Sequence, residues 1–106
     1  MAPISLPRWL QPPKVAWLRC QVEADVPPND AAVEIAVNGD TLTALVPRDA
    51  VVTERPTLPS PGRVRVRLVA ELSADDPFGE GLLADLPAAP VNGGQRIKVR
   101  PDWLVA

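Results

Sequence analysis

The sequence lacks histidine and tyrosine entirely, and it has only one cysteine among its 106 residues. Without histidine, the chain has neither the commonest general acid–base near neutral pH nor the commonest ligand for zinc and similar metals. A Ser-His or Cys-His nucleophile pair is excluded for the same reason. A single cysteine also leaves no partner for an internal disulfide. These absences predict a protein that is not an enzyme and that needs no cofactor or metal.

Cys20 itself lies in a strand-like run, on the same face as Leu18 and Val22. Free cysteine is among the most frequently buried residue types and packs as a small apolar side chain. A reactive thiol needs a cationic and partly exposed environment, whereas Arg19 would point to the opposite face of the strand. We therefore predict that Cys20 is a structural residue.

Long apolar runs are also missing. No uninterrupted apolar segment approaches the ~20 residues that a membrane-spanning helix needs. Residues 1–14 do not have the features of an export signal, because they lack an early positive charge and contain four prolines. With 46% hydrophobic and 23% charged residues, the composition is typical of a globular domain. We expect a cytoplasmic protein without membrane contact.

Proline, in contrast, is abundant, with fourteen residues, and no segment has the period of a long amphipathic helix. Instead, short runs that alternate apolar and polar residues are separated by turn sequences. Six such runs are present: 15–24, 31–37, 41–46, 63–72, 82–86 and 95–100. Between the second and third, Asn38-Gly39 indicates a hairpin, since these residues tolerate the positive φ angles of a tight turn.

This pattern of short strands and frequent turns predicts an all-β fold. The strand lengths favour a small antiparallel barrel or roll of five to six strands, of the SH3-like or OB-like type. Residues 15–106 would form this single small barrel, and residues 1–14 would form an extended, proline-rich arm. Two arrangements of the arm are open: Trp9 and Leu10 fold back onto the domain, or they stay exposed and mark a protein interface.

Positive charge is concentrated in two stretches, residues 63–67 and 96–100, each with three cations at alternate positions. Because side chains alternate along a strand, each stretch would place its cations on one face and its apolar residues on the other. Together they hold six of the eleven Lys and Arg residues, although the formal net charge is -2. The six cations are Arg63, Arg65, Arg67, Arg96, Lys98 and Arg100.

If the two basic stretches occupied neighbouring strands, like charges would face one another at a cost of up to about 1 kcal/mol per pair. Two arrangements would compensate for this repulsion. Carboxylates on adjacent strands could interleave as exposed ion pairs; the candidates are Glu23, Glu34, Glu71 and Asp85. Alternatively, the cations bind an anionic partner, which compensates for the repulsion from outside the chain.

We therefore expect a non-catalytic binding module, or an accessory subunit of a larger assembly, that engages an acidic protein partner through its basic strands. Trp17 and Arg19, which would share a strand face, and Trp9 are further candidate contacts. The alternative is an OB-like or SH3-like nucleic-acid-binding domain that uses the same face. The negative net charge and the few aromatic residues argue against it, because single-strand binders stack bases on several aromatic side chains.

Overall fold

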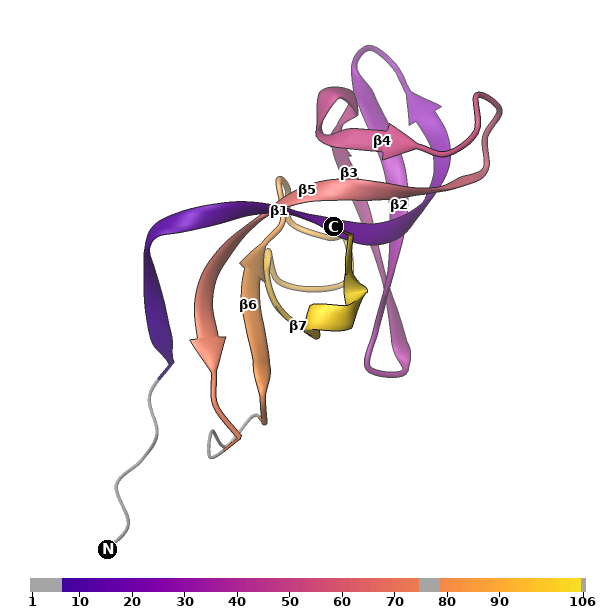
Figure 1. Cartoon of the computed structure of the whole chain (residues 1–106). Coiled ribbons are helices and arrows are strands. Elements are labelled where there is room, and N and C mark those ends of the chain that lie inside the picture. The colour runs from indigo at the N-terminus through magenta and orange to yellow at the C-terminus, as the bar shows by residue number, and fades with distance from the viewer. Residues whose placement is uncertain (1–6, 75–78, 106) are drawn as a thin grey trace, which may run out of the picture.

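The computed structural model describes residues 7–74 and 79–105. Of these residues, 65% lie in strands and only 6% in helical turns, which confirms the predicted all-β class. The elements follow in the order β1 (Arg8–Val26), β2 (Asp30–Val37), β3 (Asp40–Pro47), η1 (Arg48–Ala50), β4 (Val51–Thr53), β5 (Ser60–Leu72), β6 (Gly81–Asp85), β7 (Arg96–Val99), η2 (Pro101–Trp103) and β8 (Leu104–Val105), where η denotes a 3₁₀ turn (Figure 1).

The strands form one curled antiparallel sheet, a half-barrel whose main path has the order β3-β2-β1-β5-β6-β7. The two short strands join from the side, since β4 pairs with β5 and β8 pairs with β1. The molecule is elongated, with principal extents of 54 × 29 × 22 Å. In Figure 1, β1 and β5 run side by side through its middle, with β2 and β3 toward one end and β6 and β7 toward the other.

The hairpin predicted at Asn38-Gly39 is present. These two residues join β2 to β3, and they adopt the positive φ angles of 24° and 78° that such a turn requires. The register pairs Val37 with Asp40 directly across the turn. The local sequence thus determines the position of this hairpin, and with it which residues of β2 and β3 face the core.

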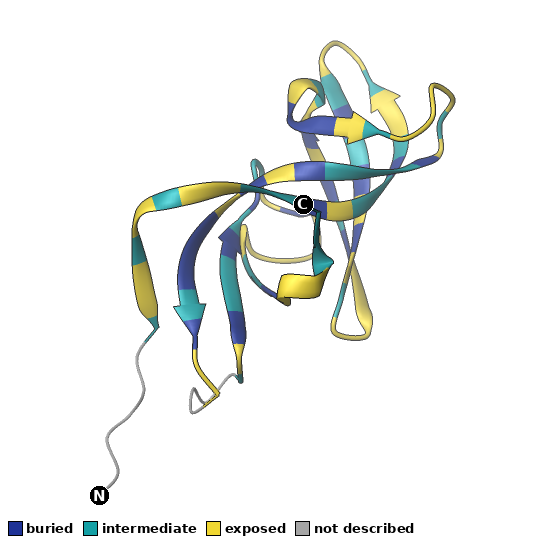
Figure 2. Cartoon of the chain, viewed as in Figure 1, coloured by how far each residue is buried: buried dark blue, intermediate teal, exposed yellow. Residues whose placement is uncertain are grey.

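The core lies on the inner face of the curled sheet, where the alternating apolar residues of its strands meet (Figure 2). It contains the predicted inward positions of β1, β2, β3 and the first part of β5. Its fully or almost fully buried members include Leu18, Val22, Val33, Ile35, Ala44, Val46, Val64, Val66, Ala84, Leu86 and Val99. Burial of these side chains is the main favourable contribution to the stability of the fold.

The alternation of β5 changes at Val69. The register with β6 shifts between Leu68 and Ala70, so that Val69 is an extra residue in the manner of a β-bulge. Ala70 and Leu72, which the period-two pattern placed inward with the earlier residues, are buried, but they lie outside the main core cluster. The bulge therefore separates β5 into two segments with different surroundings.

The outer edge of β3 is covered by the loop between β6 and β7. Asn92 donates from Nδ2 to the carbonyl oxygen of Thr41 (2.8 Å) and accepts at Oδ1 from the backbone N–H of Thr43 (3.0 Å). The N–H of Val91 donates to the carbonyl oxygen of Thr43 at 2.8 Å. This loop therefore takes the place of a further strand on β3, and it protects part of an edge that would otherwise be open to pairing with another chain.

The proline-rich N-terminal segment, as far as it lies in the described residues, belongs to β1. Arg8 pairs with Glu71 and Trp9 with Ala70, and the register then shifts before Lys14 pairs with Leu68. Leu10 packs against the core, whereas Trp9 remains 52% exposed. Residues 1–6 of the predicted arm lie outside the described residues. Leu10 thus folds back onto the domain, whereas Trp9 does not pack into the core.

Candidate functional site: a basic sheet face

The two basic stretches lie on β5 and β7, and the sheet order places β6 between these strands. They are therefore not neighbours. They nevertheless share one side of the sheet, because directly paired residues of adjacent strands point to the same face. Arg67 is paired with Asp85, which is in turn paired with Arg96. The cations of the two stretches thus meet across an intervening carboxylate.

The register also brings the candidate residues of β1 to this side. On β1, Arg19 lies opposite Arg63, and Trp17 lies opposite Arg65. Trp9 belongs to a further row, since it pairs with Ala70, which pairs with Leu83, the partner of Lys98. We call this side, which faces away from the core, the outer face. It holds Trp9, Trp17, Arg19, Arg63, Arg65, Arg67, Asp85, Arg96 and Lys98.

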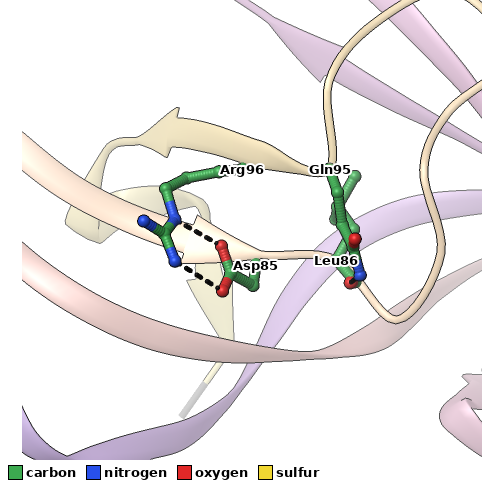
Figure 3. A network of polar contacts seen from close by, with 4 residues as sticks. All are labelled: Asp85, Leu86, Gln95 and Arg96. Atoms are coloured by element: carbon green, nitrogen blue, oxygen red, sulfur yellow. Dashed lines mark hydrogen bonds and ion pairs between the residues drawn. The ribbon is translucent and has the colours of Figure 1, made fainter.

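Asp85 forms an ion pair with Arg96. The Arg96 side chain donates from Nε to Oδ1 (2.7 Å) and from Nη2 to Oδ2 (3.0 Å) of Asp85, a two-bond ion pair that Figure 3 shows. These hydrogen bonds, aided by the charges of Arg96 and Arg67, lower the pKa of Asp85 below its ordinary value of 3.8, although partial burial opposes the shift. Of the four candidate carboxylates, Asp85 is the one that interleaves between the two basic stretches.

Two more cations of β7 and its end have local partners. Arg100, just beyond β7, donates from Nε to Oδ1 of Asp102 at 3.1 Å. Lys98 is partly buried and has an interaction partner of its own. The Arg96 guanidinium also lies over the Trp9 ring, 5.5 Å from its centroid. The start of β7 is held in place as well, because Gln95 Nε2 donates to the carbonyl oxygen of Leu86 at 2.8 Å (Figure 3).

Four arginines of the outer face remain without an ion pair among the described residues. They are Arg19, Arg63, Arg65 and Arg67. Among the nearby carboxylates, Glu71 forms an ion pair with Arg8 at 3.7 Å, and Glu34, which lines the same cleft as Arg19, forms no ion pair with it. Arg67 lies opposite Asp85, but the Asp85 carboxylate is hydrogen-bonded to Arg96.

Arg63 is held by its surroundings more firmly than the other three. Its guanidinium lies over the Trp17 ring, 5.2 Å from the centroid, and within the described residues its buried Nε has no hydrogen-bond partner. A buried donor without a partner lowers stability, and the directly opposed Arg19 adds like-charge repulsion. An anion bound beside the two opposed guanidinium groups would relieve this repulsion.

Exposed apolar side chains flank these arginines, a feature that the charge pattern alone did not indicate. Val52 of β4 lies opposite Arg63, and Val15 of β1 lies opposite Arg67. They are 40% and 64% exposed, respectively. The signal for Val15 was present in the alternation of β1, where it shares the parity of Trp17 and Arg19. The outer face thus combines guanidinium groups with apolar surface.

Cys20 is partly buried on the inner side of β1 and packs against the core cluster. It borders a cleft of about 440 Å³ that Arg19, Glu34 and Trp103 also line. Burial raises the pKa of the Cys20 thiol from 9.0 to about 11. The thiol is therefore protonated at neutral pH, and protonated thiols are poor nucleophiles.

We expect Cys20 in the folded protein to react with iodoacetamide at pH 8 about a hundredfold more slowly than in the urea-unfolded chain, because the thiolate fraction falls tenfold per unit of pKa. The rate should rise steadily as the pH approaches 11. Mass spectrometry of timed samples measures both rates. Equal rates in the folded and unfolded chains would show that the thiol is not buried in this way.

Among the described residues, no group of three or more His, Cys, Asp and Glu side chains is arranged to hold a metal ion. In the same part of the chain, no helix has the length and apolar character needed to cross a membrane. Comparison with protein families, characterised proteins and solved structures finds no significant match for this chain. The functional argument therefore depends on the chemistry of the outer face.

Proposed function

We propose that the protein is a non-catalytic binding module, or an accessory subunit of a larger assembly, whose outer face binds an acidic segment of another protein. One observation carries this proposal: four neighbouring arginines of β1 and β5 have no ion pair among the described residues, although the chain as a whole has an excess of carboxylates. An anionic partner would remove the repulsion between Arg19 and Arg63 and supply acceptors for their guanidinium groups.

The composition of the face favours a protein over a nucleic acid. Protein interfaces are enriched in arginine and aromatic residues and contain apolar surface that becomes buried on binding. Val15, Val52 and Trp9 provide exposed apolar surface on or beside the face. Binding of single-stranded nucleic acid usually depends on several stacking aromatics, whereas the ring of Trp17 is covered by Arg63. The net charge of -2 also disfavours a polyanion as large as nucleic acid.

The direct test is a titration of the protein with a fluorescein-labelled glutamate-rich peptide, with a labelled dT₂₀ oligonucleotide as the competing class. We expect the peptide to bind with a defined stoichiometry. If the oligonucleotide binds more tightly, with a log–log salt slope near about -3 for four phosphate contacts, the nucleic-acid alternative replaces the proposal. If neither ligand binds at low salt, the proposed function is wrong.

Charge reversal at Arg65 should weaken peptide binding at least about tenfold, because one attractive contact becomes repulsive and the neighbouring arginines are partly neutralised. Arg65 is exposed, so the fold should tolerate Arg65→Glu. The matched control is Lys14→Glu, which changes the net charge equally but lies opposite the buried Leu68. Fluorescence anisotropy measures all three affinities. An equal loss in both variants would mean that overall charge, and not the outer face, governs binding.

A further inference from the structure

The arginines of β5 form a regular row. Arg63, Arg65 and Arg67 alternate with Val64 and Val66, which are 0% and 1% exposed. Because the two valines are fixed in the core, the three arginines must leave the opposite side of the strand. A strand rises about 3.4 Å per residue, so their Cα atoms repeat every ~7 Å along β5. The register between β1 and β5 is uninterrupted from Lys14 to Val22, so no bulge disturbs this repeat.

Each arginine of the row has its own neighbour on an adjacent strand. Arg63 lies opposite Val52, Arg65 opposite Trp17, and Arg67 opposite Val15. These neighbours are apolar and do not compete with a ligand carboxylate for the guanidinium groups. On the second neighbouring strand, Arg63 faces Arg19, and Arg67 faces Asp85, whose carboxylate is hydrogen-bonded to Arg96. The row is therefore a linear series of cationic positions, each with an apolar side chain on one side. A carboxylate at each position can accept two hydrogen bonds from one guanidinium group.

We infer that the partner segment is an extended chain with acidic residues at alternate positions, i, i+2 and i+4. This inference rests on the proposed function and names the pattern that the outer face would recognise. In an extended peptide, alternate side chains point to the same side and have the same ~7 Å repeat as the arginine row. Consecutive acidic residues would direct every second carboxylate away from the row, so fewer ion pairs would form at the same net charge.

Two peptides of identical composition test this inference: one with three glutamates at alternate positions separated by threonine, and one with the three glutamates in a block followed by the threonines. We expect the alternating peptide to bind about fivefold more tightly, since one additional exposed ion pair contributes up to about this factor in affinity. Both peptides carry the same charge, so general electrostatic attraction does not separate them.

The variant Arg67→Ala shortens the row to Arg63 and Arg65, to which both peptides can present two glutamates, so the alternating peptide should bind only about as tightly as the block peptide. Lys14→Ala is the matched control and should preserve the fivefold difference, because Lys14 is not on the outer face. If the two peptides bind the wild-type chain equally, or if the block peptide binds more tightly, the spacing inference is wrong while the proposed function stands. If neither peptide binds at low salt, both are wrong.

Discussion

Replacing Leu18 by alanine is expected to lower the free energy of unfolding by about 2–5 kcal/mol. Leu18 is 1% exposed at the centre of β1, where it is paired with Val64 of β5 and with Leu104 of β8. The truncation removes apolar contacts on both sides of the strand and leaves a cavity that the surrounding backbone cannot close. A domain of this size is commonly stable by only about 5–15 kcal/mol, so the loss would be a large share of the total.

Urea denaturation, followed by the far-ultraviolet circular dichroism signal, measures this change. The matched control is Leu45→Ala, the same substitution at an outward position of β3 where the side chain is 46% exposed. It should cost far less, since little apolar surface is withdrawn from contact and no closed cavity forms. Similar losses in the two variants would contradict the placement of the core on the inner face.

Replacing Gly62 by alanine is expected to cost about 1–3 kcal/mol, for a reason that is steric and not conformational. A Cβ atom at this position would overlap the backbone carbonyl oxygen of Val52 and would lie 3.1 Å from Cγ2 of Val22. Gly62 pairs with Thr53 of β4 on one side and with Cys20 of β1 on the other. Since the obstructing oxygen belongs to the backbone, β4 would have to move away from β5.

The location of this destabilisation can be tested together with its magnitude. Hydrogen exchange should accelerate at the amide of Glu54, which donates to the carbonyl oxygen of Pro61 at 2.9 Å beside this junction. Gly94→Ala is the matched control, because its nearest neighbour, the carbonyl oxygen of Arg96, is at an ordinary contact distance of 3.9 Å. If Gly62→Ala is as stable as the wild-type chain, the close approach of β4 to β5 is wrong.

Much of the fold follows from local sequence patterns. Period-two alternation predicts the strands, and Asn38-Gly39 predicts their best-defined turn, because both effects depend on neighbouring residues alone. The start of β1 is different. The alternating pattern begins at Val15, whereas β1 begins at Arg8. The first part of β1 was not predicted because it includes Pro12 and Pro13, and proline is disfavoured within strands. The bulge at Val69 was also hidden, because the apolar run Leu68-Val69-Ala70 has no alternation.

The site could be predicted only in part. The alternation of Arg63, Arg65 and Arg67 with valines is a local signal, and it places them on one face as expected. Strand order decides which of these cations have an ion-pair partner. Strand order itself depends on contacts between segments that are far apart in the sequence. The sequence analysis predicted four candidate carboxylates, including Asp85. That Asp85 pairs with Arg96 follows only from the position of β6 between β5 and β7.

The continuity of β1 bears on how the molecule loses its structure. This single strand of 19 residues pairs with β5 over most of its length, with β2 near its end, and with β8 at Trp17 and Leu18. The two ends of the elongated molecule therefore share the backbone of β1, and unfolding of this strand would break ladder hydrogen bonds toward both ends. We expect the chain to behave as one cooperative unit in denaturation, despite a shape that suggests two lobes.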